Sequence, residues 1–277
     1  MTTYFETGGG CIAYDVIGDG PLVVLAPGLG DVRAAYRFLA PELAAAGHRV
    51  VTTDLRGHGA SSTGWDSYSR TDVADDLLAL VAHLDAGPAV LVGASFAGGA
   101  VAIAAARDPE RVRAVVQLGP GTRRPKAAPK DLTPRYLGGM ALIAGAMLTR
   151  SVSLWGAYQR HAYPGARPDD FEAYLRALQA GLRGPGRMAA AAAMAWSSPA
   201  DAEDRLGGVR CPALVVMGTR DPDFPDPRRE AEGIVAAMPP GVGTIAMIDG
   251  AGHYPHAQFP GQVAEVVLPF LKEHAGA

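Results

Sequence analysis

The chain has 277 residues, of which 48% are hydrophobic and 19% charged, and its formal net charge is −3. This composition supports a large buried core and argues against disorder. A weakly negative chain offers no electrostatic basis for binding nucleic acid. The length fits either one α/β domain with an insertion or two domains.

The cysteines and the hydropathy of the chain argue against a cysteine-based metal or redox site, a secreted protein and a membrane-spanning protein. Cys11 and Cys211 lie far apart and match no metal-binding or redox spacing, so we expect free thiols in a reducing compartment. Residues 1–10 lack the basic and apolar segments of a signal peptide. The longest uncharged stretch, residues 136–149, is shorter than the ~20 residues that span a bilayer. We therefore expect a soluble cytoplasmic protein that uses no metal and no cofactor.

Apolar runs of strand length alternate with helical patterns along most of the chain. Several runs are apolar throughout, which is typical of parallel strands covered on both faces. The alternation predicts an α/β fold with a doubly wound, mostly parallel sheet. In chain order we expect an extra antiparallel edge strand at 11–16, strands at 22–26, 49–53, 89–92, 112–118, 213–217 and 244–248, and helices at 34–46, 71–84, 96–107, 228–237 and 261–274.

The alternation breaks once, between about residues 121 and 208. Apolar residues recur there at helical spacing, which predicts helices near 137–148, 171–178 and 188–196. We expect a core domain over 1–120 and 209–277, with residues 121–208 inserted as a helical cap. The 137–148 segment carries no charge, so we expect it to be buried on two sides or to face a ligand.

A serine turn is the strongest chemical signal. Residues 90–101, VLVGASFAGGAV, form an apolar run, a glycine, then Ser95 and a small-residue helix start. This layout is typical of a nucleophile elbow, which exposes a serine at a tight strand-to-helix turn. Ala97 stands where the usual G-x-S-x-G pattern has glycine. The alternative is that Ser95 merely caps the helix.

A nucleophilic serine needs a base and an orienting acid. His253 follows the last expected strand in the glycine-rich segment 249–253, and Asp221 follows the preceding strand. Both positions lie past the carboxyl ends of strands, where open α/β sheets place their sites. Asp223 and His256 are the rival acid and base. We expect His58 to be a loop histidine and Asp54 to cap a turn.

These motifs together resemble the α/β-hydrolase family over nearly the whole chain. The resemblance rests on the serine turn 93–97, the loop APGLG at 26–30, the turn DLRGHGAS at 54–61, and the segments that hold Asp221 and His253. The resemblance implies a Ser95–His253–Asp221 triad, with the backbone N–H groups of Leu29 and Phe96 forming an oxyanion hole. Pro27 replaces the histidine common in that loop, which puts the loop's hydrogen-bonding support in question.

The expected function is that of a serine hydrolase. It would cleave a carboxylic ester, thioester or lactone of an apolar small molecule through an acyl-enzyme. A cofactor-free perhydrolase or haloperoxidase-type enzyme, or a slow-turnover ligand receptor, would carry the same triad. Haloalkane dehalogenases and epoxide hydrolases have aspartate where Ser95 stands. A dinucleotide-binding loop fails at Arg33, where a third glycine is required. The expected substrate pocket comprises Met140, Trp155, Tyr158, Trp196 and Tyr254.

Overall fold

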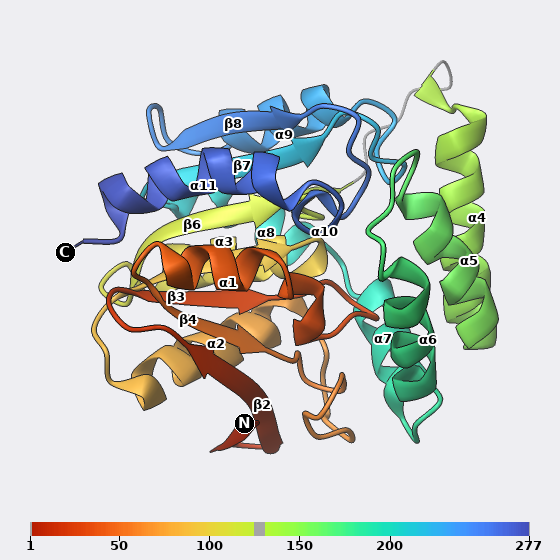
Figure 1. Cartoon of the computed structure of the whole chain (residues 1–277), viewed down its shortest axis with the longest axis horizontal. Coiled ribbons are helices and arrows are strands. Elements are labelled where there is room, and N and C mark those ends of the chain that lie inside the picture. The colour runs from red at the N-terminus through yellow and green to blue at the C-terminus, as the bar shows by residue number, and fades with distance from the viewer. Residues whose placement is uncertain (1, 125–130, 277) are drawn as a thin grey trace.

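An eight-stranded sheet forms the centre of the molecule in the computed structural model, which describes residues 2–124 and 131–276 (Figure 1). The strand order is β1-β2-β4-β3-β5-β6-β7-β8. The β1–β2 and β2–β4 pairs are antiparallel and the other pairs are parallel, so the doubly wound, mostly parallel sheet is confirmed. The strands are β1 Thr3–Thr7, β2 Gly10–Ile17, β3 Leu22–Ala26, β4 Arg49–Thr53, β5 Ala89–Ala94, β6 Val112–Leu118, β7 Ala213–Gly218 and β8 Gly243–Ile248.

Helices cover both faces of the sheet. One face carries α1 (Leu39–Ala45) and α11 (Pro260–His274), whose apolar side chains form one core cluster with the strands. The other carries α2 (Arg70–Leu84), α3 (Phe96–Arg107) and α9 (Pro227–Ala236), which form a second cluster (Figure 1). Every residue of β3, β5 and β7 is buried, which explains why these strands read as unbroken apolar runs.

Two expectations about the N-terminal part are wrong. The strand expected at 11–16 is not at the edge, because β1 pairs with its outer side in a hairpin. The helix expected at 34–46 is broken into a 3-10 helix, Arg33–Tyr36, and α1. Pro41 explains the break, since a proline lacks the amide that an inner helical turn needs and is tolerated in the first turn of α1.

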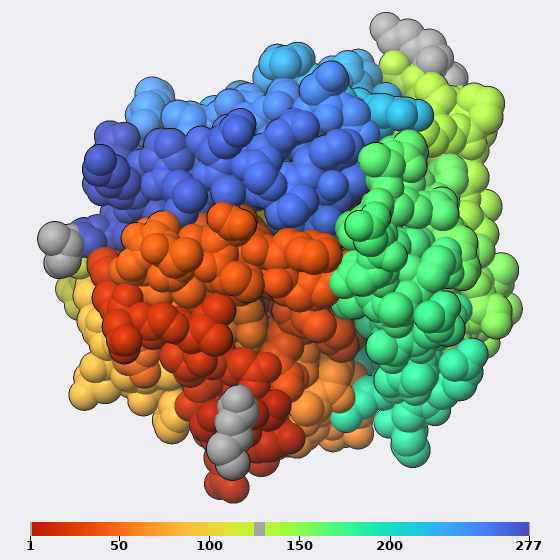
Figure 2. Space-filling view, viewed as in Figure 1, coloured from red at the N-terminus to blue at the C-terminus, as the bar shows by residue number. Residues whose placement is uncertain are grey.

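In the part of the chain that the structure describes, five α-helices lie between β6 and β7, and we call residues 134–203 the helical insertion. They are α4 Pro134–Thr149, α5 Val152–Ala162, α6 Phe171–Leu182, α7 Arg187–Trp196 and the short α8 Ala200–Glu203; a 3-10 helix, Leu206–Gly208, leads back into the sheet. Helices α4 to α7 lie beyond the carboxyl ends of the strands (Figure 1). Figure 2 shows the insertion, coloured green to teal, packed along one side of the molecule against both the N-terminal and C-terminal segments. Sequence reasoning missed α5.

Helix α4, whose 137–148 segment carries no charge, is not buried on two sides. Leu137 is 49% and Leu148 72% exposed, so one face of α4 lies in solvent. Burial on two sides is not needed because glycine and alanine fill much of this helix, and small side chains need little apolar cover. That α4 faces a ligand stays a prediction. Among the described residues, no helix is both long and apolar enough to cross a membrane.

Candidate active site

The turn between β5 and α3 holds Ser95 in a strained backbone conformation. Its φ of 49° and ψ of −115° lie outside the regions that L-residues favour, at a cost of about 1–3 kcal/mol. A Cβ on Gly93 would lie 2.3 Å from the Ala97 carbonyl oxygen, so the turn demands glycine there. Ala97 itself is accommodated with its side chain buried. The alanine in the serine motif is therefore compatible with the turn.

Backbone hydrogen bonds hold the Ser95 turn from both sides. The Ser95 amide donates to the Leu118 carbonyl at the end of β6, at 2.9 Å. The Ser95 carbonyl accepts from the amides of Gly98 and Gly121, both at 3.0 Å. Every other residue in 89–105 is buried, whereas Ser95 is partly exposed and its side chain does not cap α3. The turn thus leaves the Ser95 hydroxyl accessible, and this hydroxyl does not cap the helix.

The loop after β3 lies directly against this turn. A Cβ on Gly28 would be 3.0 Å from the Ser95 Cβ, so the loop backbone passes close to the serine. Among the described residues, neither the Leu29 amide nor the Phe96 amide donates a hydrogen bond to another group. Phe96 is the first residue of α3, where helix amides are free and carry partial positive charge. The two N–H groups expected to form an oxyanion hole are therefore unengaged.

Gly30 supplies the support that Pro27 cannot give this loop. Its amide donates to His58 Nε2 at 2.9 Å, and its carbonyl accepts from Trp155 Nε1 at 2.9 Å. A Cβ on Gly30, whose φ is +66°, would lie 2.6 Å from the Trp155 ring. Sequence reasoning missed both partners, because His58 lies in the next loop and Trp155 in the helical insertion.

His58 is an acceptor in this arrangement, not a base. Its Nδ1 contacts the Arg56 carbonyl at 3.0 Å, which assigns the ring proton to Nδ1 and leaves the Nε2 lone pair for Gly30. Burial lowers the pKa of His58, which favours this neutral form. The expectation of a loop histidine holds, and its role is to fix the neighbouring loop.

Trp155→Phe is expected to lower the free energy of unfolding by about 1–3 kcal/mol, because the Gly30 carbonyl loses its donor. Urea unfolding of the wild type and variant measures the change. Trp196→Phe is the matched control, since Trp196 is 59% exposed and should give a change near zero. Equal effects of the two substitutions would show that the Trp155–Gly30 hydrogen bond does not hold the loop.

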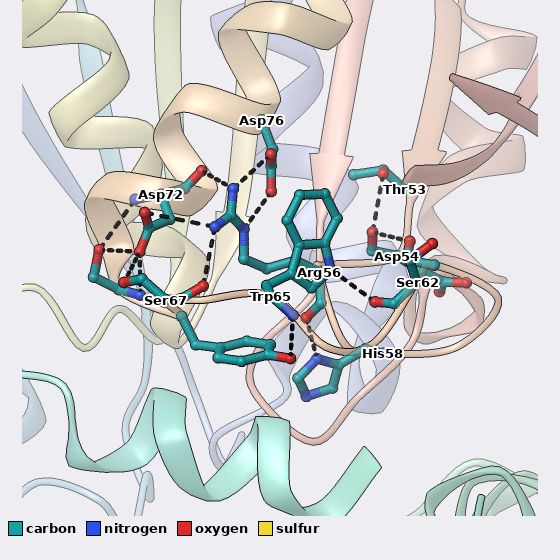
Figure 3. Close-up of polar contacts among 12 residues, drawn as sticks. Thr53, Asp54, Arg56, His58, Ser62, Trp65, Ser67, Asp72 and Asp76 are labelled. Atoms are coloured by element: carbon teal, nitrogen blue, oxygen red, sulfur yellow. Dashed lines mark hydrogen bonds and ion pairs between the residues drawn. The ribbon is translucent and has the colours of Figure 1, made fainter. Parts of the chain in front are cut away.

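The turn after β4 is held by a network of hydrogen bonds and ion pairs, and this network supports His58 (Figure 3). Arg56 pairs with Asp76 through Nε at 2.7 Å and Nη2 at 2.8 Å, and its guanidinium stacks on Trp65. Asp54 accepts the amides of Arg33 and Ala60, both at 2.8 Å. Asp54 therefore stabilises the loops around it, as expected, and its oxygens are engaged by these amides.

His253 and Asp221 form a buried pair next to the serine turn. His253 Nδ1 lies 2.9 and 3.1 Å from the two carboxylate oxygens of Asp221, and both side chains are at most 2% exposed. Gly119, which follows β6, lies against this pair: a Cβ there would be 3.3 Å from Asp221 Oδ2. Since β5 to β8 are consecutive neighbours in the sheet and Ser95, Asp221 and His253 each follow one of these strands, all three lie at the carboxyl end of the sheet.

The electrostatics of this pair favour a charged imidazole. Burial opposes the charge on His253, but the carboxylates of Asp221 and Asp223 outweigh it and raise the pKa of His253 to about 9. Within the described residues no hydrogen bond joins Ser95 Oγ to His253; His253 Nε2 lies 3.4 Å from Asp223 Oδ2 instead. Asp223 thus contacts the opposite ring nitrogen from the one held by Asp221.

The rival base has a different environment. His256 lies in the short helix α10 (Pro255–Gln258) and stacks on Tyr36 with ring centroids 4.8 Å apart. Neither of its ring nitrogens has a hydrogen-bond partner among the described residues. Burial lowers the pKa of His256 to about 3, so the ring is neutral. None of the described carboxylates is hydrogen-bonded to it.

Asp221, Asp223 and His253 also bring ligand-type atoms within 4.8 Å of one another. The two carboxylates, however, contact different nitrogens of one imidazole, so a metal at either nitrogen would compete with a carboxylate already seated there. Structural and catalytic zinc sites need side chains that converge on one point. The cluster fits a protonated imidazole between two anions.

Of the five side chains expected in the substrate pocket, three are buried in one apolar cluster, namely Trp155, Tyr158 and Tyr254. Trp155 and Tyr158 stack with centroids 4.8 Å apart, and Tyr254 packs edge-on against the His253 ring at 5.1 Å. Met140 is half-buried in α4. Trp196, also expected in the pocket, is not enclosed with them, because 59% of its surface is exposed at the last residue of α7.

The helical insertion is hydrogen-bonded to the loops that follow β3, β7 and β8. His253 donates its amide to the Ala162 carbonyl at 3.0 Å, and Arg135 Nη2 donates to the Asp221 carbonyl at 3.2 Å. Tyr174 donates to buried Asp31, the residue after Gly30. Burial raises the pKa of Asp31 to about 6, against the lowering effect of the Tyr174 hydrogen bond. These contacts were invisible in the sequence, since they join segments far apart in the chain.

A sheet of this topology with a serine turn at its carboxyl edge defines an α/β hydrolase. The family model for the alpha/beta hydrolase fold matches residues 21–258. The chain belongs to this family, as the sequence motifs indicated.

The individual proteins similar to this chain include hydrolases. It is 30% identical over 212 residues to a 2-(acetamidomethylene)succinate hydrolase of Mesorhizobium japonicum, covering 73% of this chain and 71% of that protein. It is 42% identical over 91 residues to a magnesium-chelatase 30 kDa subunit of Rhodobacter capsulatus, but that alignment covers only 32% of this chain and 31% of the relative. An esterase structure from Exiguobacterium antarcticum superposes with a TM-score of 0.82 at 20% identity, covering 98% of this chain and all (100%) of that one.

Proposed function

We propose that the protein is a serine hydrolase that cleaves a carboxylic ester of an apolar small molecule through an acyl-enzyme. The observation that carries this proposal is the strained, partly exposed Ser95 at the edge where the buried His253–Asp221 pair lies. Strain of this kind persists only where the surrounding structure enforces it, and it gathers at functional sites. A 2-(acetamidomethylene)succinate hydrolase and an esterase among the similar proteins agree with hydrolysis of an acyl compound.

Each group has a role that its position supports. His253 Nε2 would take the proton of Ser95 as Oγ attacks the acyl carbonyl, and Asp221 would stabilise the imidazolium through Nδ1. The unengaged amides of Leu29 and Phe96 would donate to the oxygen that becomes negative. The alcohol would leave with the proton from His253, and a water activated by the same ring would release the acid.

The character of the substrate follows from the side chains beside His253. Trp155, Tyr158 and Tyr254 are buried aromatic residues, and Phe224 lies 6.5 Å from the His253 ring between centroids. An acyl group that enters this site would contact mainly carbon, which favours an apolar or aromatic portion.

The value of kcat/KM for p-nitrophenyl esters is expected to rise with acyl length until the pocket is full. Each buried methylene contributes ~0.8 kcal/mol, or about fourfold in kcat/KM. A series from acetate to octanoate, with benzoate added, measures this dependence. If acetate is the best substrate and every longer or aromatic ester is worse, the pocket is small and the substrate class is wrong.

Covalent labelling tests the proposal more generally. A fluorophosphonate should label the purified protein at Ser95, and p-nitrophenyl esters should turn over repeatedly. Labelling without turnover would indicate a ligand receptor of the same fold. Hydrogen peroxide added as the acyl acceptor distinguishes perhydrolysis from hydrolysis, because the same groups could pass the acyl group to either acceptor.

A further inference from the structure

The His253 imidazole lies between two carboxylates, one at each ring nitrogen. Asp221 contacts Nδ1 at 2.9 Å, and Asp223 Oδ2 lies 3.4 Å from Nε2. A serine hydrolase needs an orienting carboxylate on Nδ1 and a free lone pair on Nε2 to accept the serine proton. A carboxylate at Nε2 is not part of that requirement, so Asp223 needs a separate explanation.

Asp223 is held in this position by several contacts. Tyr158, from α5 of the helical insertion, donates to Asp223 Oδ2 at 2.7 Å. The Asp223 amide donates to Asp221 Oδ1 at 3.0 Å, which fixes its backbone relative to the first carboxylate. The other oxygen, Oδ1, is buried and has no hydrogen-bond partner among the described residues. Oδ2 is therefore the oxygen that acts, and it faces the ring.

We propose that Asp223 is a positioning residue that holds a proton at His253 Nε2 and so keeps the base protonated in the resting enzyme. The proposal rests on His253 being the base of the proposed hydrolase. Before Ser95 can be deprotonated, the proton on Nε2 must pass to water or hydroxide, which frees the Nε2 lone pair. Tyr158 makes this control depend on the helical insertion, because it sets where the carboxylate lies.

The surrounding charges agree with a shared proton. Burial raises the pKa of Asp223 while the charge of His253 lowers it, and the pKa of His253 is raised to about 9, so the two groups titrate as one unit. The other titratable or charged groups around the pair are Asp221 after β7, Asp31 after β3, Arg135 and Tyr136 on α4, Tyr158 and His161 on α5, Tyr254 after β8 and His256 on α10.

The pH dependence of kcat/KM tests the proposal. Since the active base is the neutral imidazole, kcat/KM of the wild type should rise with pH through an apparent pKa near 9. Asp223→Asn removes the anion at Nε2 and should move the apparent pKa of this rise about one to three pH units lower. A shift of one unit gives about tenfold more neutral imidazole at pH 7. The same experiment on Asp249→Asn controls for net charge, because Asp249 is exposed on the loop that carries His253.

A measurement that does not depend on enzyme activity, the pKa of His253 by NMR, separates this proposal from the proposed function. The ring resonances of His253, assigned by comparison with His253→Gln, are titrated by NMR in Ser95→Ala and in Ser95→Ala with Asp223→Asn. A lower pKa of His253 in the double variant supports the proton-holding role even if ester hydrolysis were never observed. An unchanged pKa, or an equal shift with Asp249→Asn, would overturn it and leave Ser95 as nucleophile unaffected.

Discussion

Ser95→Ala is expected to lower kcat for p-nitrophenyl ester hydrolysis by ~10⁴–10⁶-fold. The reason is that the substitution removes the only atom proposed to attack the acyl carbon and leaves its neighbours in place. The fold should be retained, because the Ser95 side chain caps no helix and the turn is held by backbone hydrogen bonds. Steady-state kinetics and thermal unfolding of the purified variant measure both effects.

Ser198→Ala is the matched control for this variant, because Ser198 is exposed and lies on the short segment between α7 and α8. It should retain wild-type kcat. Appreciable turnover by Ser95→Ala, in a preparation free of other esterases, would remove Ser95 from the role of nucleophile.

Asp221→Asn is expected to lower kcat by about 10⁴-fold, since an amide can neither hold the Nδ1 proton in the required tautomer nor stabilise the imidazolium. Asp221 is fully buried at 2.9 Å from Nδ1, so no water can replace it. Asp223→Asn, compared at the pH where each enzyme is most active, should have a much smaller effect. The reverse ranking would make Asp223 the orienting acid.

The parallel strands and the helices between them could be predicted from the sequence because each is indicated by a local pattern of apolar residues. The apolar runs of β3, β5 and β7 are buried on both faces, and α3 begins and ends where its apolar pattern predicts. Two of the failures have a clear physical cause. The edge strand β1 is short and half exposed, so its pattern is weak, and α4 exposes Leu148 on a face that the absence of charge suggested was covered.

The chain positions of Ser95, Asp221 and His253 could be predicted because each follows a strand and lies in a turn with its own composition. The roles of Trp155 and Tyr158 could not, because both act through contacts with loops more than sixty residues away. The sequence offers Asp223 as a rival to Asp221. The sequence could not indicate that the two would contact different nitrogens of one ring, since side-chain direction within a loop depends on tertiary packing.

Trapping the acyl-enzyme tests the central claim most directly. The wild-type protein is mixed with p-nitrophenyl butyrate, quenched with acid within the first turnover, digested and examined by mass spectrometry. We expect the butyryl group on the peptide that contains Ser95, at close to one group per molecule, and none in Ser95→Ala. Butyryl on another residue in the wild type, or rapid hydrolysis with no acylated peptide at any quench time, would contradict a Ser95 acyl-enzyme.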